Sequence, residues 1–195
     1  MGFGARICLI MFTNYVAQAA FAVCAPMVPL EFERKGIQGS YVGLVFALYS
    51  VGYIIWPPVV SKYGDRMGRT TMLALALVVM GTAFVCFGLI AIMVNKVHIL
   101  TLASVLRLIH GMCCSTIFTT GCFLCSNEYP DKEERDKMCG YLTAFGGTGL
   151  ITGPLIGSVL FDYFGFKLCF FIYGSTIVLI GIVFRLAVPA KTSTT

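Results

Sequence analysis

Residues 43–68, GLVFALYSVGYIIWPPVVSKYGDRMG, recur as residues 140–165, GYLTAFGGTGLITGPLIGSVLFDYFG. The two stretches are 97 positions apart, and twice 97 is 194, almost the whole length of 195 residues. Each copy is a long apolar segment that ends in an aspartate and a glycine, which indicates a duplicated membrane unit and not a duplicated soluble domain. The shared positions are Gly43, Ala47, Gly52, Pro57, Ser61, Asp65 and Gly68, which return as Gly140, Ala144, Gly149, Pro154, Ser158, Asp162 and Gly165.

The composition also indicates a membrane protein. Hydrophobic residues make up 58% of the chain and charged residues 12%, whereas ordinary soluble domains carry roughly 25% charged residues. The net charge is +5, but the basic residues lie in short clusters between apolar runs. They form no continuous basic stripe, so we expect no nucleic-acid partner.

The nine cysteines fall mostly within the apolar runs. In that setting cysteine packs as a small hydrophobic residue. Cys122 and Cys125 form a CxxC pattern without a second pair, which does not indicate a metal or redox site. We therefore expect no metal and no cofactor. The sequence contains no recognisable nucleophile, metal cluster or phosphate loop, so we also do not expect an enzyme.

Six segments are long enough to cross a bilayer as helices, which takes about 20 residues each. We predict an all-α membrane protein whose spans lie near residues 7–30, 40–60, 71–94, 99–126, 138–161 and 166–188. Adjacent prolines, Pro57 and Pro58, are expected to bend the second span or end it early.

Lys and Arg are unequal on the two sides of these spans, and Arg107 lies inside one. Nine basic residues fall on one side and four on the other, so we expect both termini on the cytoplasmic side. The first group is Arg6, Lys62, Arg66, Arg69, Lys132, Arg135, Lys137, Arg185 and Lys191, and the second is Arg34, Lys35, Lys96 and Lys167.

Each repeat holds three spans, an odd number, so the second repeat must enter the membrane from the opposite face. We predict one six-helix bundle built from inverted units, residues 1–97 and 98–195. Inverted repeats of this kind characteristically enclose a binding site near the middle of the bilayer, which favours a transporter.

The end of the second span carries a charged turn, Ser61-Lys-Tyr-Gly-Asp65-Arg66-Met-Gly68-Arg69. Glycine suits a tight turn between helices, and an acid flanked by arginines can change partners as helices move. The alternative is an ordinary basic loop that only orients the chain. The turn resembles the loop signature of the major facilitator superfamily, Gly-x-x-x-Asp-Arg-x-Gly-Arg, with Ser61 at the first glycine.

The fourth span places Arg107, His110, Gly111 and Cys114 on one helical face. An arginine within a membrane span costs several kcal/mol on insertion scales, so we expect Arg107 to face the interior and hold a partner. It is a candidate coupling or substrate residue, or else a structural partner. The segment resembles the superfamily's Arg-x-x-Gln-Gly signature with His110 at the glutamine, and histidine can titrate near neutral pH.

The fifth span contains Gly149, Gly153, Pro154 and Gly157 in a pattern of small residues that lets helices approach closely. The pattern resembles the antiporter signature Gly-x-x-x-Gly-Pro-x-x-Gly-Gly of the same superfamily, with Ser158 at the last glycine. The three resemblances occur in the expected spans and order, and together they cover the whole chain. They imply the amino-terminal half of a major facilitator fold, whose members are secondary transporters.

Within the superfamily, residues 26–36, the 149–157 signature and residues 164–166 most resemble the vesicular amine and polyamine transporters and the drug/proton antiporters. The resemblance implies transport of a small organic solute. Exchange of organic cations or amines for protons is the form of transport that this branch suggests. Such proteins usually hold a carboxylate in the first or fifth span. This chain has none in its first span before Glu31, and it offers Thr143 in the fifth.

Polar and aromatic side chains on two further spans are candidates for lining a solute path. Asn14 and Gln18 share one face of the first span, and Tyr49, Tyr53 and Trp56 share one face of the second. Aromatic faces attract organic cations, although the same rings can simply pack against a neighbouring helix.

The charged stretch from 127 to 137 is expected to be a hydrophilic loop. Our sharper hypothesis is that Asp65 pairs with Arg135 in one conformation and releases it in the other, as a latch on the cytoplasmic face. The family's proteins usually have twelve spans, so this chain needs a second six-span half as partner, besides the lipid bilayer and a small-molecule substrate. The alternative function is a membrane assembly or binding subunit that does not transport.

Overall fold

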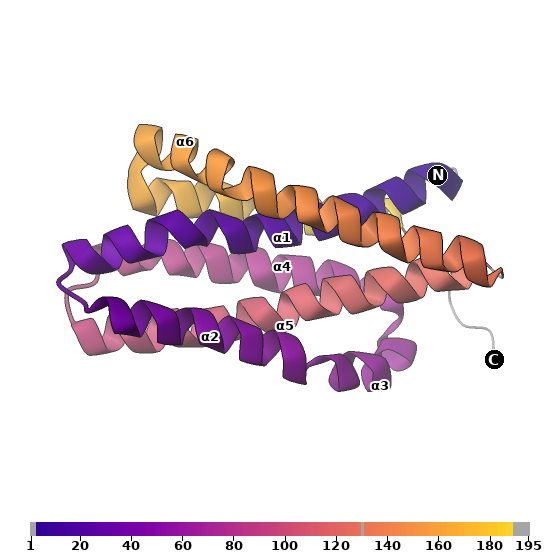
Figure 1. Cartoon of the computed structure of the whole chain (residues 1–195), viewed down its shortest axis with the longest axis horizontal. Helices are drawn as coiled ribbons and strands as arrows, with labels where there is room; N and C mark the ends of the chain where they lie inside the picture. The colour runs from indigo at the N-terminus through magenta and orange to yellow at the C-terminus, as the bar shows by residue number, and fades with distance from the viewer. Residues whose placement is uncertain (1–2, 130, 189–195) are drawn as a thin grey trace.

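The described residues, 3–129 and 131–188 of a computed structural model, form helices that run along one long axis (Figure 1). Their apolar sequences favour helices because every backbone polar group is then satisfied within the segment. The described elements are α1 (Phe3–Arg34), α2 (Gly39–Ile55), α3 (Pro57–Met67), α4 (Arg69–Gly88), a 3-10 turn η1 (Leu89–Ile92), α5 (Lys96–Glu128) and α6 (Lys132–Ala187).

The last of these, α6, is two helices joined at Gly165. Its 56 residues would extend about 84 Å as one straight helix, far more than the roughly 30 Å hydrocarbon core. Gly165 takes φ 70° and ψ 177°, a conformation that side chains disfavour. The chain doubles back there, as Figure 1 shows. This break separates the fifth span from the sixth, as the sequence predicted.

The second span is bent by 53° between α2 and α3. The bend lies at Trp56, and Pro57 occupies the first turn of α3, where its missing N–H costs nothing. Counting this bent pair as one span and α6 as two, the described residues supply the six predicted spans. The predicted all-α membrane class is confirmed, and so is the proline bend.

Two expected loops are shorter than the sequence suggested. The stretch from Ser61 to Met67 is helical, and the turn before α4 is made by Gly68 with φ 79°. The loop expected over 127–137 is also wrong in length, because α5 continues to Glu128 and α6 begins at Lys132. The Asp131 carboxylate caps α6 by accepting hydrogen bonds from the N–H groups of Glu133 and Glu134.

Small residues hold the helices close. α1 packs against α6, α2 packs against α5, and α4 packs against both α5 and α6. A Cβ atom added to Gly111 would overlap the Tyr49 carbonyl oxygen, and one added to Gly153 would come 2.6 Å from the Ala19 carbonyl oxygen. Backbones at this separation leave no room for a methyl group, as is usual where membrane helices associate.

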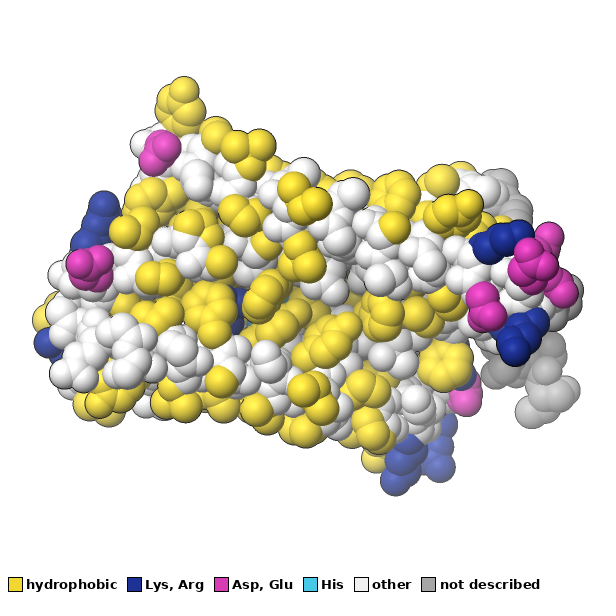
Figure 2. All heavy atoms as spheres, viewed as in Figure 1, with side chains coloured by type: hydrophobic (Ala, Val, Ile, Leu, Met, Phe, Trp, Pro, Cys, Tyr) yellow, Lys and Arg dark blue, Asp and Glu magenta, His cyan; other side chains and the backbone are white. Residues whose placement is uncertain are grey.

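The face drawn in Figure 2 is largely without charge in its middle. Most of the charged side chains on this face lie near the two ends of the long axis. The start of α1 and the end of α6 lie at one end of the bundle (Figure 1). Turns alternate between the ends: α1–α2, α4–α5 and the Gly165 break lie at one, and α3–α4 and α5–α6 at the other. This arrangement suits a chain that crosses a bilayer six times.

Candidate functional site

Arg107 lies in the interior of the bundle, on α5, with 1% of its surface exposed. Its Nη1 atom is 3.3 Å from Nδ1 of His110, one helical turn further along. The guanidinium also lies over two aromatic rings, 4.2 Å from the centroid of Phe46 and 5.7 Å from that of Phe21. These rings come from α2 and α1, so three helices meet at this cation, and cation–π attraction partly offsets its burial.

No carboxylate neutralises Arg107 among the described residues. The five ion pairs found there involve other basic residues. Within the described part of the chain, the Nε and Nη2 atoms of Arg107 are buried without a hydrogen-bond partner, and so is Nε2 of His110. The side chain of His110 and the rings of Phe21 and Phe46 are thus the contacts that the described residues give this cation.

His110 is 2% exposed and lies between two aromatic rings. The centroid of its ring is 5.0 Å from that of Tyr49 and 4.9 Å from that of Phe84. Gly111, the next residue, allows α2 to lie against α5 at this level. The structure therefore brings the fourth-span residues Arg107, His110 and Gly111 together with Tyr49 of the second span.

The candidate residues of α1 lie against α6. Asn14 is 2% exposed, and its Nδ2 donates a hydrogen bond of 2.7 Å to the Leu142 carbonyl oxygen. A Cβ atom on Gly146 would come 2.7 Å from Asn14 Nδ2 and 3.2 Å from Cγ of Gln18. Asn14 and Gln18 thus share a face, as predicted, and that face contacts the fifth span. Whether they line a solute path stays a prediction.

The three aromatic candidates of the second span take separate positions. Tyr49 is stacked with Tyr53 at 6.1 Å between ring centroids, and it contacts Phe21 at 4.4 Å. Trp56 lies at the bend, where its Nε1 donates a hydrogen bond of 3.0 Å to Thr116 Oγ1 on α5. Tyr49 therefore borders the surroundings of Arg107 and His110, whereas Trp56 ties the bend to the fourth span.

The glycines of the fifth-span signature contact α1. A Cβ atom on Gly149 would overlap the Tyr15 carbonyl oxygen, and one on Gly157 would come 2.8 Å from the Met27 side chain. Pro154 lies inside the helix, whose backbone keeps helical angles up to Gly165. Close packing of the fifth span on the first is what the structure shows for this signature.

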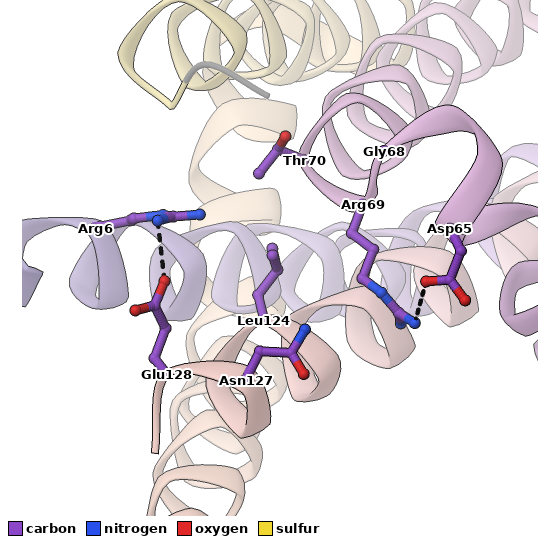
Figure 3. A pocket seen from close by; sticks show the side chains of 9 residues that line it. Arg6, Asp65, Gly68, Arg69, Thr70, Leu124, Asn127 and Glu128 are labelled. Atoms are coloured by element: carbon purple, nitrogen blue, oxygen red, sulfur yellow. Dashed lines mark hydrogen bonds and ion pairs between the residues drawn. The ribbon is translucent and has the colours of Figure 1, made fainter. Parts of the chain in front are cut away.

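The charged turn borders a cavity of about 240 Å³ at one end of the bundle (Figure 3). Two ion pairs belong to its lining: Nη1 of Arg6 is 2.9 Å from Glu128 Oε1, and Nη2 of Arg69 is 2.6 Å from Asp65 Oδ1. The Arg69 guanidinium also lies 3.7 Å from the centroid of the Phe123 ring. The cavity is lined by Arg6, Gly64, Asp65, Gly68, Arg69, Thr70, Leu124, Asn127 and Glu128.

The described part of the structure does not contain the predicted ion pair between Asp65 and Arg135. Asp65 pairs with Arg69 in its own turn, and no ion pair joins it to Arg135, a half-buried residue of α6. Arg66 is exposed beside them. The Asp65–Arg135 pair therefore stays a prediction about another conformation.

Sequence reasoning missed three contributors: Phe21, Phe46 and the Arg6–Glu128 pair. Phe46 precedes Tyr49 by three positions and so shares its helical face, which was an available signal. Phe21 follows Asn14 by seven positions, again two turns along one face. The charges of Arg6 and Glu128 lie just outside the first and fourth spans, at the same predicted side of the membrane.

Comparison with known proteins finds a matching family and several relatives. The profile described as Major Facilitator Superfamily matches residues 7–195. The MFS-type transporter SLC18B1 of Mus musculus is 22% identical over 166 residues, which is 85% of this chain and 36% of that protein. The Multidrug resistance protein MdtG of Escherichia fergusonii is 28% identical over 182 residues, 91% of this chain and 42% of that protein. MdtG of Yersinia enterocolitica is 29% identical over 163 residues, 81% of this chain and 37% of that protein.

The chain therefore spans less than half the length of these relatives, between 36% and 42%. The matched region includes all six spans, with the Arg107 surroundings and the charged turn.

Proposed function

Because this chain belongs to the major facilitator superfamily, whose members are transporters, we propose that it is one half of a secondary transporter that moves a small organic solute by alternating access. The observation that carries the proposal is Arg107, a cation buried at 1% exposure between three membrane helices without a carboxylate partner among the described residues. Such a residue is costly to insert and is retained where it serves a pathway or a coupling step.

The proposal requires a second six-span half. Solute passes between two bundles in this type of transporter, and a single bundle has nothing to rock against. The short share of the relatives' length that this chain spans supports a missing half. The half can be a further part of the same gene product, a second copy of the chain or a partner chain.

Within the chain, the proposed units are residues 1–97 and 98–195. Gly68 and Gly165 support them, because both take positive φ at the ends of equivalent spans, 97 positions apart. The excess of basic residues at the Arg69 end supports cytoplasmic termini. Lys191, which contributes to that count, lies outside the described residues.

The finer part of the proposal is exchange of organic cations, such as amines, for protons. It rests on the resemblance to the amine and drug antiporter branch, and the printed names of the MdtG relatives agree with a drug substrate for those proteins. The competing function is a non-transporting subunit for membrane assembly or binding, derived from a transporter half.

Uptake tests the proposal directly. The assembly purified from its own membrane is reconstituted into vesicles, with and without a proton gradient, and supplied with radiolabelled tetraphenylphosphonium or benzoate. We expect uptake of at least one probe well above that of protein-free vesicles. A proton gradient that raises tetraphenylphosphonium uptake above the level of protein-free vesicles supports cation/proton exchange. Uptake equal to the protein-free level for both probes, from an assembly that remains folded, favours the non-transporting subunit.

The latch is tested by crosslinking. Asp65→Cys with Arg135→Cys should crosslink with a short bifunctional thiol reagent, to an extent that changes when solute is added. Arg6→Cys with Glu128→Cys is the matched control, because those side chains are 2.9 Å apart here and should crosslink in the state described. The unsubstituted chain with its native cysteines sets the background. Equal crosslinking of the Asp65–Arg135 pair in all states would rule out the latch.

A further inference from the structure

The surroundings of Arg107 contain hydrogen-bond donors without acceptors. Arginine has only donors, so Nδ1 of His110 must accept from Arg107 Nη1, and the ring proton of a neutral His110 then lies on Nε2. Arg107 Nε, Arg107 Nη2 and His110 Nε2 are three buried donors that no group of residues 3–129 or 131–188 satisfies. A site with surplus donors favours a ligand that supplies only acceptors.

The two free nitrogens of Arg107 lie on the same edge of the guanidinium. Nε–H and one N–H of Nη2 point in parallel, whereas Nη1 is already engaged with His110. Parallel donors on one edge match the two oxygens of a carboxylate, which they bind as a bidentate pair. The part of Arg107 left without a partner is therefore the edge whose geometry matches a carboxylate.

The charge of the site agrees with this geometry. Arg107 is a cation at 1% exposure, and a second cation placed beside it would be repelled in a medium of low dielectric constant. The rings that attract cations here, Phe21 and Phe46, already face the guanidinium of Arg107 itself. An organic cation at this position would find the two rings already occupied by Arg107. It would also find no carboxylate paired with Arg107 among the described residues.

The same two rings supply an apolar lining. Phe21 and Phe46 are half-buried, and their ring centroids are 6.4 Å apart in an edge-on contact between α1 and α2. Tyr49 packs against Phe21 on the inner side. A ligand that reaches the guanidinium between α1 and α2 must displace these rings, and it gains apolar contact with them if its body is hydrophobic.

We propose that the solute carries a carboxylate on an apolar body, and that this carboxylate binds the Nε and Nη2 edge of Arg107. The inference rests on the proposed transport function, because it assigns the solute class to the same interior site. It differs from the organic-cation prediction drawn from the resemblance, and a binding measurement decides between them without any transport.

The measurement compares three probes of similar shape: benzoate, the neutral benzamide and the cation benzylammonium. Each is added to the full 195-residue chain in detergent, and Tm and Kd are recorded. We expect benzoate to raise Tm by about 3 °C at ten times its Kd, and the other two probes to bind about 10-fold more weakly or not at all. Equal binding of the three probes, or tighter binding of benzylammonium, would overturn the inference.

Two variants tie the binding to the site. Arg107→Gln should weaken benzoate binding about 10-fold or more, whereas the matched control Arg185→Gln, an exposed arginine near the end of α6, should not.

In case Arg107→Gln fails to fold, Phe46→Ala offers a second test. It removes the ring 4.2 Å from the guanidinium and should increase the rate of benzoate binding. Its control is Phe145→Ala, an exposed ring of α6. Unchanged benzoate binding in Arg107→Gln, or an unchanged rate in Phe46→Ala, would contradict the assignment.

The carboxylate has two possible sources, a solute or an acidic side chain of the second bundle. Repeating the assay on the assembly purified from its own membrane separates them. Benzoate that still stabilises the assembly leaves the site to a solute. Benzoate that stabilises only the isolated chain assigns the carboxylate to the second bundle and overturns the inference about the solute. Neither result depends on uptake, so a failure of the transport proposal is recognised separately.

Discussion

Replacing Gly111 with alanine is expected to cost about 3 kcal/mol of stability, because overpacking against backbone cannot be relieved by a side-chain rotation. The added Cβ would overlap the Tyr49 carbonyl oxygen and lie 3.0 Å from the Tyr53 backbone nitrogen. The only relief is to move α2 away from α5. That movement would also displace Tyr49 from His110, whose rings are 5.0 Å apart. We expect a Tm lower by several degrees and an aggregated fraction on size exclusion in detergent.

Gly43→Ala is the matched control. Gly43 also lies on α2, but a Cβ atom there meets no other atom within 4 Å. Alanine should be neutral at this position or stabilise the helix by about 0.5–1 kcal/mol through its higher helix propensity. If Gly111→Ala and Gly43→Ala have the same Tm, the close approach of α2 to α5 is not what holds the second span in place.

Replacing Arg107 with leucine is expected to separate stability from function. Insertion scales put the cost of an arginine at the centre of a membrane helix at about 2.5–3.5 kcal/mol. The cation–π contacts with Phe21 and Phe46 offset about 1–2 kcal/mol of this cost. Leucine should therefore keep Tm or raise it slightly. Uptake by the reconstituted assembly should fall about 10- to 100-fold, because the charged donors are lost.

Arg107→Lys refines this result. Lysine keeps the charge but not the planar fork, so uptake should be weaker than in the unsubstituted protein and stronger than in Arg107→Leu. A leucine variant with a Tm many degrees lower would instead indicate that Arg107 is a structural partner of His110 and the rings. A stable variant with full uptake would remove Arg107 from the transport site altogether.

Local sequence signals predicted the spans and their breaks well. Long apolar runs predicted the six spans, and Pro57 predicted the bend, which measures 53° in the structure. The repeated glycines coincide with the turns at Gly68 and Gly165. The helical stretch of α3 was not predicted, because the charges after Ser61 resemble a solvated loop. In the structure Val60 and Gly64 of α3 are buried, and this contact with the bundle extends the helix.

The site was predicted in part, for a physical reason. Helical periodicity shows which residues share a face of one helix, so Arg107, His110 and Gly111 were grouped correctly. Periodicity does not show which neighbouring helix covers that face. The contacts of Arg107 with Phe21 and Phe46, and of Trp56 with Thr116, therefore required the structure. The roles of these residues in transport stay predictions until the variants are measured.

The position of Trp56 gives the chain a built-in optical probe. It is the only tryptophan among 195 residues, and its indole N–H is bound to Thr116 Oγ1 at 3.0 Å where α2 bends into α3. Indole emission shifts in wavelength with the polarity of its surroundings. The fluorescence of the unlabelled protein therefore reports on this one hinge between the second and fourth spans, in detergent, in vesicles or during a rapid-mixing experiment.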